Sequence, residues 1–298
     1  MKRGTITLAI VTGALATSTA YARVTRIVID EVVPLPAADC GGMACEQLAG
    51  RAFGELDPAS PANAIINDIA FAKDADGKVR YVTTFILTKP VDPARASGLM
   101  WHEVPNRGLR RPNVVAERGF GDIDVHSAWQ GDNAGATAVR ATAAVSQPLW
   151  LKVPIARKAD GTPITGNVLG RIVNRSGPGS QPVIVQTNPV PYLPVSLDTT
   201  KSRLVSRVAE STRGEVIGET VITPTDWAWA TCDASNPFPG TPSPTQICLK
   251  NGFDAGKLYQ VVYTSADAYA LGVGFAAWRD VGVFFRLRAP TTRARPIL

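Results

Sequence analysis

The sequence is poor in the side chain that most often performs acid–base catalysis. It contains two histidines, His102 and His126, among 298 residues, and no serine lies in the pattern G-x-S-x-G. That pattern places a nucleophilic serine on a tight strand-to-helix turn, and its triad needs a histidine held by a carboxylate. Both histidines lie in or beside expected strands, where a role at the polar boundary of a sheet is the simpler interpretation. We therefore assign no nucleophile, acid or base.

Long hydrophobic runs are also lacking. After the first 22 residues no segment is apolar enough to cross a bilayer, which takes about 20 residues. The N-terminus MKRGTITLAIVTGALATSTAYA has Lys2 and Arg3, a short apolar run and an A-x-A site that ends at Ala22. This order is typical of a cleaved signal peptide, with an uncleaved anchor as the alternative. We expect a secreted or periplasmic protein without a membrane span.

The sequence has only a small excess of charge of one sign. The formal charge is +6, from 31 Lys+Arg against 25 Asp+Glu, and removal of Lys2 and Arg3 leaves 29 − 25 = +4. Arginines in the last 20 residues carry this excess, so the rest of the chain is close to neutral. Without a basic stripe interleaved with aromatic residues, we expect no nucleic-acid partner.

The sequence contains few cysteines, and their number is even. The four cysteines are Cys40, Cys45, Cys232 and Cys248, and in an exported chain they indicate disulfides with three possible pairings. We predict the local pairs Cys40–Cys45 and Cys232–Cys248, because both intervals read as loops. Zinc is the alternative, but the spacing fits no zinc pattern and both histidines are far away in sequence.

The remaining sequence divides into segments of different pattern. Residues 23–132 alternate strands, loops and a helical turn, which is typical of a parallel α/β sheet. Short runs separated by Gly and Pro then give way to a strand and a helix expected over 271–287. The expected division is a signal peptide at 1–22, the first strands of a core at 23–132, a β-rich insertion or cap at 133–251, a returning strand and helix of the core at 252–288, and a disordered tail at 289–298.

Local patterns within the first segment predict its elements. VRYVTTFILT (79–88) is rich in β-branched and aromatic residues and predicts a strand. NAIINDIAFA (63–72) predicts a second strand, joined to the first by a turn at DADGK (74–78). CEQLAGRAFGELDP (45–58) has no such run and predicts a loop.

Two patterns imitate ligand sites. GVGFAA (272–277) matches a dinucleotide-binding fingerprint, but a loop separates it from the preceding strand and no acidic residue follows at the required distance. Small residues that let a helix pack closely explain it better. Asp122, Asp124 and His126 alternate along one strand face, which could hold a metal, although a half-exposed strand gives the same pattern. We expect no cofactor and no metal.

Four stretches together resemble the alpha/beta hydrolase domain-containing proteins, a family of large exported proteins that includes esterases. They are MWHEVPNRG (100–108), RGFGDIDVHSAWQGD (118–132), ITGNVLGRI (164–172) and NGFDAGKLYQVVYTSADAYALGVGFAAWRD (251–280). The last is the most specific, since members carry a similar G-F-x-x-G-x-x-Y stretch before a small-residue helix that ends in Arg-Asp. The resemblance covers the mature chain to about Leu287.

The resemblance implies the α/β fold class, with a partial α/β-hydrolase sheet and a β-rich insertion. In the family the helix precedes a strand, the serine elbow, the acid and the base, and this sequence ends before all of them. We therefore expect a truncated protein that lacks the C-terminal half of the fold. Complete relatives would act on a small-molecule or polymeric ester.

The resemblance also implies where a site would lie. The loop after the strand MWHE is where such proteins place an oxyanion-hole amide, and an ordinary glycine turn is the alternative. The three candidates for that loop are Asn106, Arg107 and Gly108. Ligand sites lie beyond the carboxyl ends of strands in an open α/β sheet, and an ordinary loop is again the alternative. The four candidates for lining a pocket are Trp129, Gln130, Gly131 and Asp132.

Two functions remain open at this point. The first is an exported protein related to carboxylic-ester hydrolases that is inactive alone, because it lacks an identifiable triad. The second is a non-catalytic exported binding protein that uses the β-rich segment to hold a ligand or partner. The sequence indicates neither the ester nor the oligomeric state.

Overall fold

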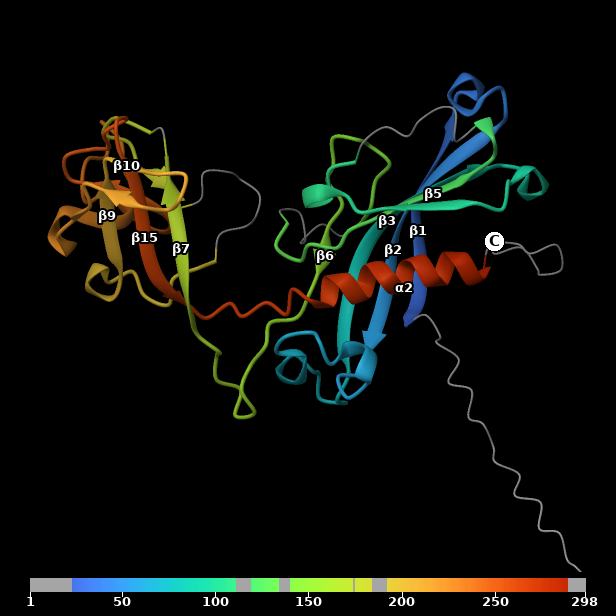
Figure 1. Ribbon diagram of the computed structural model, residues 1–298, viewed down its shortest axis with the longest axis horizontal. Coiled ribbons are helices and arrows are strands. Elements are labelled where there is room, and N and C mark those ends of the chain that lie inside the picture. Colours follow the sequence, from blue (N-terminus) through green and yellow to red (C-terminus); the bar gives the residue numbers. More distant parts are fainter. Residues whose placement is uncertain (1–22, 111–118, 134–139, 174, 184–191, 289–298) are drawn as a thin grey trace, which may run out of the picture.

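The computed structural model describes residues 23–110, 119–133, 140–173, 175–183 and 192–288. Strands dominate, and α2 (Val273–Arg288) is the one α-helix whose bounds fall within these residues. Figure 1 shows two groups of strands, with α2 lying across the group that contains β1, β2 and β3. The predicted signal peptide and tail lie outside the described residues.

The first group is one sheet, which we call the N-terminal sheet. Its strands are β1 (Val24–Leu35), β2 (Cys45–Leu56), β3 (Val79–Pro90), β4 (Met100–Glu103), β5 (Ile123–Ser127) and β6 (Leu151–Lys152). The order is β1-β2-β3-β5-β4, and β6 pairs with β3. All neighbours are antiparallel except β4 and β5, which run parallel. β3 contains the predicted strand at 79–88.

β2 replaces the loop that the sequence predicted over 45–58. Its two inner glycines each pair with an aromatic residue of β3, Gly50 with Phe85 and Gly54 with Tyr81. A Cβ on Gly54 would lie 1.9 Å from the Tyr81 ring, so the ring fills the space above the glycine. This contact compensates for the packing that glycine lacks within a strand.

The strand predicted over 63–72 is replaced by two 3₁₀ turns, η2 (Pro61–Asn63) and η3 (Ile69–Phe71). Asp68 between them has a φ of 58°, a left-handed conformation that ends an extended run and that Asp tolerates better than most residues. Asp68 therefore helps to keep this apolar segment out of the sheet.

The second group, which we call the β-rich unit, contains two small sheets and a hairpin. Its strands are β7 (Gly166–Ile172), β8 (Gln181–Pro182), β9 (Arg203–Arg207), β10 (Ala209–Glu210), β11 (Val216–Ile217), β12 (Thr220–Val221), β13 (Trp227–Thr231), β14 (Thr241–Leu249) and β15 (Leu258–Ser265). The sheets have the orders β12-β9-β15-β7 and β13-β14-β8, and β10 pairs with β11. Trp227, Ile247 and Val261 are buried in the core of this unit.

The predicted α/β class, with a partial α/β-hydrolase sheet, is wrong. The structure is mostly β-sheet, and every pair of described strands except β4–β5 is antiparallel. β15, expected as a returning strand of the core, pairs instead with β7 and β9. The order of strand and helix along the chain does not tell which strands pair, and this is why the expectation failed.

α2 matches the helix expected over 271–287, and its small residues lie against its neighbours. A Cβ on Gly274 would lie 1.7 Å from the Trp129 carbonyl oxygen, and one on Gly282 would lie 2.7 Å from His102 Nδ1. The GVGFAA pattern therefore serves close packing, as the sequence indicated. No helix among the described residues has the length and apolar character needed to cross a membrane.

Both predicted disulfides are present, Cys40–Cys45 and Cys232–Cys248. The first closes the turn between η1 (Ala37–Cys40) and β2, and the second joins the end of β13 to β14. Two disulfides are compatible with a secreted or periplasmic protein, because such bonds persist in oxidising compartments.

Candidate functional site

The two sets of predicted site residues lie together beyond β4 and β5. Because these strands are parallel, their carboxyl ends meet at the same edge of the sheet. The Arg107 N–H donates to Gln130 Oε1 over 2.5 Å, and the Arg107 guanidinium pairs with Asp132 over 2.7 Å. The Trp129 indole donates to the Pro105 carbonyl over 2.9 Å. The structure thus joins the two loops by main-chain and side-chain bonds.

In the predicted oxyanion loop, η5 (Asn106–Gly108), the amides of Arg107 and Gly108 already have acceptors within the protein. Arg107 is left-handed (φ 52°, ψ 31°), and Gln130 accepts from its amide. The Gly108 amide points to the Pro105 carbonyl at 3.4 Å. Gly108 itself has a φ of 72°, and a Cβ there would lie 2.0 Å from the Leu149 carbonyl oxygen. Glycine is therefore required by the tight turn, and a ligand would have to displace Gln130 to reach the Arg107 amide.

Of the pocket-lining candidates, Gly131 serves packing, since a Cβ there would lie 2.6 Å from a methyl of Val153. Trp129 packs against Phe275 of α2, with ring centroids 5.2 Å apart. Asp132 is held by Arg107 with its side chain 13% exposed. These residues form a closed contact between two loops and α2.

A Ser–His pair that the sequence analysis did not combine lies beside these loops. His102 Nε2 is 2.8 Å from Ser127 Oγ. The two residues are diagonal neighbours on adjacent strands, because His102 of β4 is opposite Val125 of β5 and Ser127 lies two residues beyond Val125 on the same face. Burial, followed by the nearby His126, lowers the pKa of His102 to about 4. His102 is therefore neutral at pH 7, as a general base must be.

Access to that pair is closed. Ser127 has 0% exposure, and the His102 ring stacks on Trp278 of α2 with centroids 4.4 Å apart. The Trp278 indole donates to the Glu103 carbonyl over 3.1 Å, which fixes the ring in place. A hydroxyl beside a neutral imidazole has nucleophile–base geometry, but no substrate can reach Ser127 in this arrangement.

The alternating residues Asp122, Asp124 and His126, which were considered as metal ligands but not predicted to bind a metal, have other partners. His126 Nε2 lies 3.0 Å from Asp124 Oδ2, and its Nδ1 lies 3.4 Å from Glu103 Oε2. Asp122 instead accepts from the Trp101 indole over 2.8 Å. Among the residues that the structure describes, no group of three or more His, Cys, Asp or Glu side chains could hold a metal.

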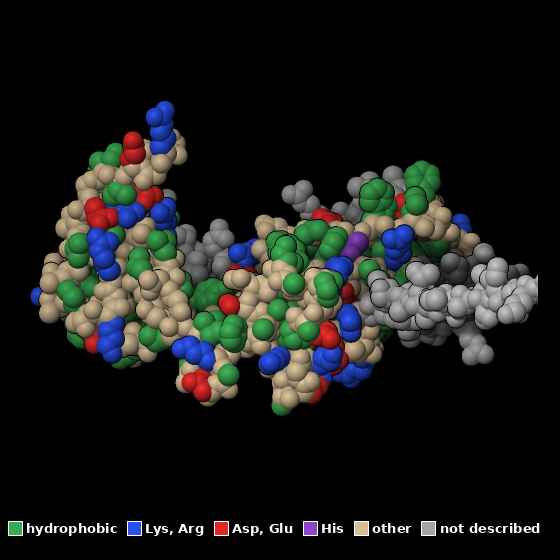
Figure 2. Space-filling model, turned by 60° about the horizontal axis from the view of Figure 1, so that its bottom comes forward, with side chains coloured by type: hydrophobic (Ala, Val, Ile, Leu, Met, Phe, Trp, Pro, Cys, Tyr) green, Lys and Arg blue, Asp and Glu red, His purple; other side chains and the backbone are tan. Residues whose placement is uncertain are grey.

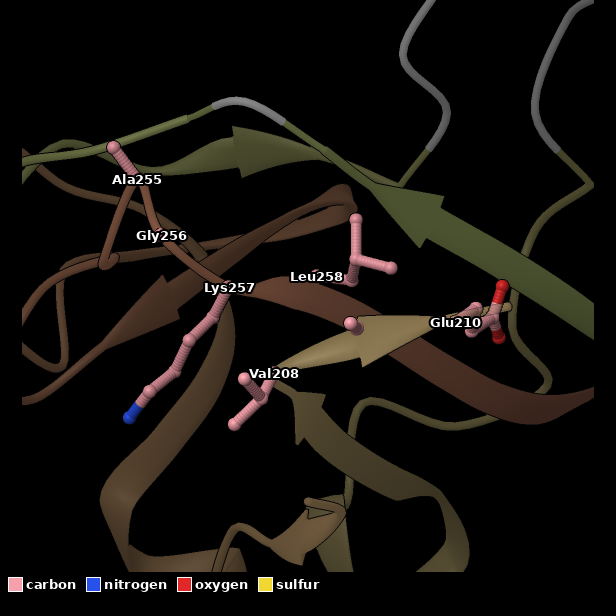
Figure 3. Close-up of a pocket in the computed structure, with 7 residues that line it drawn as sticks. Val208, Glu210, Ala255, Gly256, Lys257 and Leu258 are labelled. Carbon is pink, nitrogen blue, oxygen red and sulfur yellow. The ribbon is translucent and has the colours of Figure 1, made fainter. Parts of the chain in front are cut away.

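A cavity of about 330 Å³ lies in the β-rich unit, away from all predicted residues. Its lining residues are Val208, Ala209, Glu210, Ala255, Gly256, Lys257 and Leu258. Figure 3 shows the Val208 and Leu258 side chains between Glu210 at one end and Lys257 at the other. The two lining segments meet because Leu258 of β15 pairs with Arg207 of β9. Residues 208–210 belong to the β-rich segment expected to bind a ligand, whereas residues 255–258 were assigned to the core, so no sequence pattern indicated that the two segments form one cavity.

The two charged residues of the cavity differ in how they are partnered. Arg171 Nη1 lies 3.0 Å from Glu210 Oε2, and Arg207 also donates to this carboxylate. Lys257 Nζ lies 3.8 Å from Asp254, and both side chains are exposed. Figure 2 shows basic and acidic side chains beside each other over the visible face of the molecule as well.

Comparison with known proteins gives no function for this chain. No family model matches it, no curated protein matches it, and no solved structure matches it. Function is therefore argued from the geometry and chemistry of the sites themselves.

Proposed function

We propose that the chain is an exported, non-catalytic binding protein whose ligand occupies the cavity between Val208 and Leu258. The observation that carries this proposal is the cavity itself, open to solvent and formed by two segments of the β-rich unit. Its volume of about 330 Å³ is at the lower end of the range for small-molecule sites. The ligand is therefore a small molecule.

The lining of the cavity favours binding without chemistry. It includes no serine, cysteine or histidine, the side chains that most often act as nucleophile or base. Glu210 is held by two arginines, Arg171 and Arg207, which already occupy its oxygens. Lys257 remains, and an exposed ammonium has no means of activation as a nucleophile.

Binding at this cavity can be tested with methyl NMR spectra of the full mature chain against a library of small molecules. We expect the Val208 and Leu258 methyl signals to shift with at least one class of ligand. Shifts confined to the methyl groups of Leu151 and Val153, which lie around Trp129 and Gly131, would place the ligand elsewhere and contradict the proposal.

A second candidate, descent from carboxylic-ester hydrolases, is favoured by the 2.8 Å contact between Ser127 and His102. Hydrolysis by this pair would require α2 to move, because Trp278 covers His102 and Ser127 has no exposed surface. We therefore propose that Ser127 and His102 have a structural role and that this chain by itself does not hydrolyse esters.

We expect the purified chain to release p-nitrophenol from p-nitrophenyl butyrate no faster than its Ser127→Ala variant, because no ester can reach the Ser127 hydroxyl. Initial rates measured at pH 8 check this, and intact mass after treatment with a fluorophosphonate should show no adduct. Phosphonate-sensitive hydrolysis with an adduct mapped to Ser127 would instead establish the second candidate.

A further inference from the structure

We infer that the cavity of the β-rich unit selects a small carboxylate that carries an apolar chain. This inference rests on the proposed function and adds the class of ligand. It follows from three features, which are the partners of Glu210, the exposure of Lys257 and the apolar side chains beside the cavity.

Glu210 is not available to a ligand. Arg171 contacts both of its oxygens, Oε1 at 3.2 Å and Oε2 at 3.0 Å, and Arg207 donates to Oε1 as well. A carboxylate that accepts several charge-assisted bonds has few lone pairs left for a ligand cation. The acidic end of the cavity therefore gives no attraction for an amine.

Lys257 is available. Its side chain is 43% exposed, and its ion pair with Asp254 spans 3.8 Å, with Asp254 itself 56% exposed. An ammonium group has three donors, and an exposed pair at this distance is weak and easily exchanged. A ligand carboxylate could therefore accept from Lys257 with little loss of existing contacts.

Apolar side chains lie beside the cavity and continue onto the surface. Val208 is 58% exposed beside the cavity, and Ile217, whose carbonyl accepts from the Val208 amide, is 53% exposed. An aliphatic chain laid on these side chains leaves water, and each buried methylene strengthens binding about fourfold.

The test compares three probes with the same six-carbon chain and different head groups, namely hexanoate, hexanamide and hexylamine. Each is titrated into the full mature chain while the Val208 and Leu258 methyl signals are followed by NMR. We expect hexanoate to bind about tenfold more tightly than hexanamide, the ratio that one charge-assisted contact gives. Added salt should weaken only hexanoate.

Two variants test whether Lys257 causes the preference for hexanoate over hexanamide. Lys257→Ala should reduce hexanoate affinity about tenfold and leave hexanamide affinity unchanged. Lys250→Ala is the matched control, since Lys250 is also exposed and paired with an acid, Asp226 at 3.4 Å, but does not line the cavity. Both lysines are on the surface, so the methyl spectra should show the fold unchanged.

The outcomes separate the two proposals. If hexanamide or hexylamine binds as tightly as hexanoate, or if the preference survives Lys257→Ala, the carboxylate inference is overturned while binding at the cavity stands. If no probe and no library compound shifts the two methyl signals, binding at the cavity fails and the inference fails with it.

Discussion

Replacing Gly274 by alanine is expected to lower the free energy of unfolding by about 3 kcal/mol, as overpacking of a rigid contact does. The added Cβ would lie 1.7 Å from the Trp129 carbonyl oxygen and 3.0 Å from a Leu151 methyl. The nearest atom belongs to the main chain, so it cannot rotate away, and α2 must shift from the N-terminal sheet. Urea unfolding followed by tryptophan fluorescence measures the loss.

Gly166→Ala is the matched control for this substitution. Gly166 lies in β7, and a Cβ there would meet nothing within 4 Å, so we expect a change within about 0.5 kcal/mol. If Gly274→Ala were as stable as Gly166→Ala, then α2 would not pack against Trp129 in solution, and the closure of the Ser127–His102 pair would be in doubt.

Acid is expected to destabilise the chain through His102, by up to about 3 kcal/mol. Burial lowers the pKa of His102 to about 4 in the folded chain, against about 6.5 in an unfolded chain. Between these values the unfolded chain binds a proton that the folded chain does not. The stability is therefore fully present above about pH 6.5 and is lost as the pH falls toward 4.

His102→Gln isolates this effect from the titration of the carboxylates. Glutamine can still bond to Ser127 but does not titrate, so the variant should lack the part of the pH dependence that His102 causes. Urea unfolding of both proteins between pH 7 and pH 4.5 gives the comparison. Identical pH slopes for the two proteins would contradict the burial of a neutral imidazole at this position.

Much of the local structure could be predicted because it depends on residues that are close to one another in the sequence. β-branched and aromatic residues predicted β3, and a run of small residues indicated α2. The disulfide pairs followed from short loops between cysteines. Partners distant in sequence could not be predicted in this way. β2 became a strand because Tyr81 and Phe85 cover its glycines, and β15 joined β7 and β9 where a core strand was expected.

The two loops predicted to carry site residues lie together, and their function stays a prediction. Parallel β4 and β5 bring Arg107 and Asp132 into contact. That Gln130 would occupy the Arg107 amide depends on a side-chain rotamer that no sequence pattern reveals. The pairing of Ser127 with His102 had a usable signal, since both residues lie on neighbouring expected strands, but the register was needed to see it. The cavity depends on the pairing of β9 with β15 and had no signal.

A crystal structure of the mature chain grown with hexanoate tests the central claim most directly. The account predicts electron density for the ligand between Val208 and Leu258, with its carboxylate at Lys257 and Ser127 still bonded to His102. Ligand density against Ser127, with α2 moved away from His102, would contradict it and identify the buried pair as the working site.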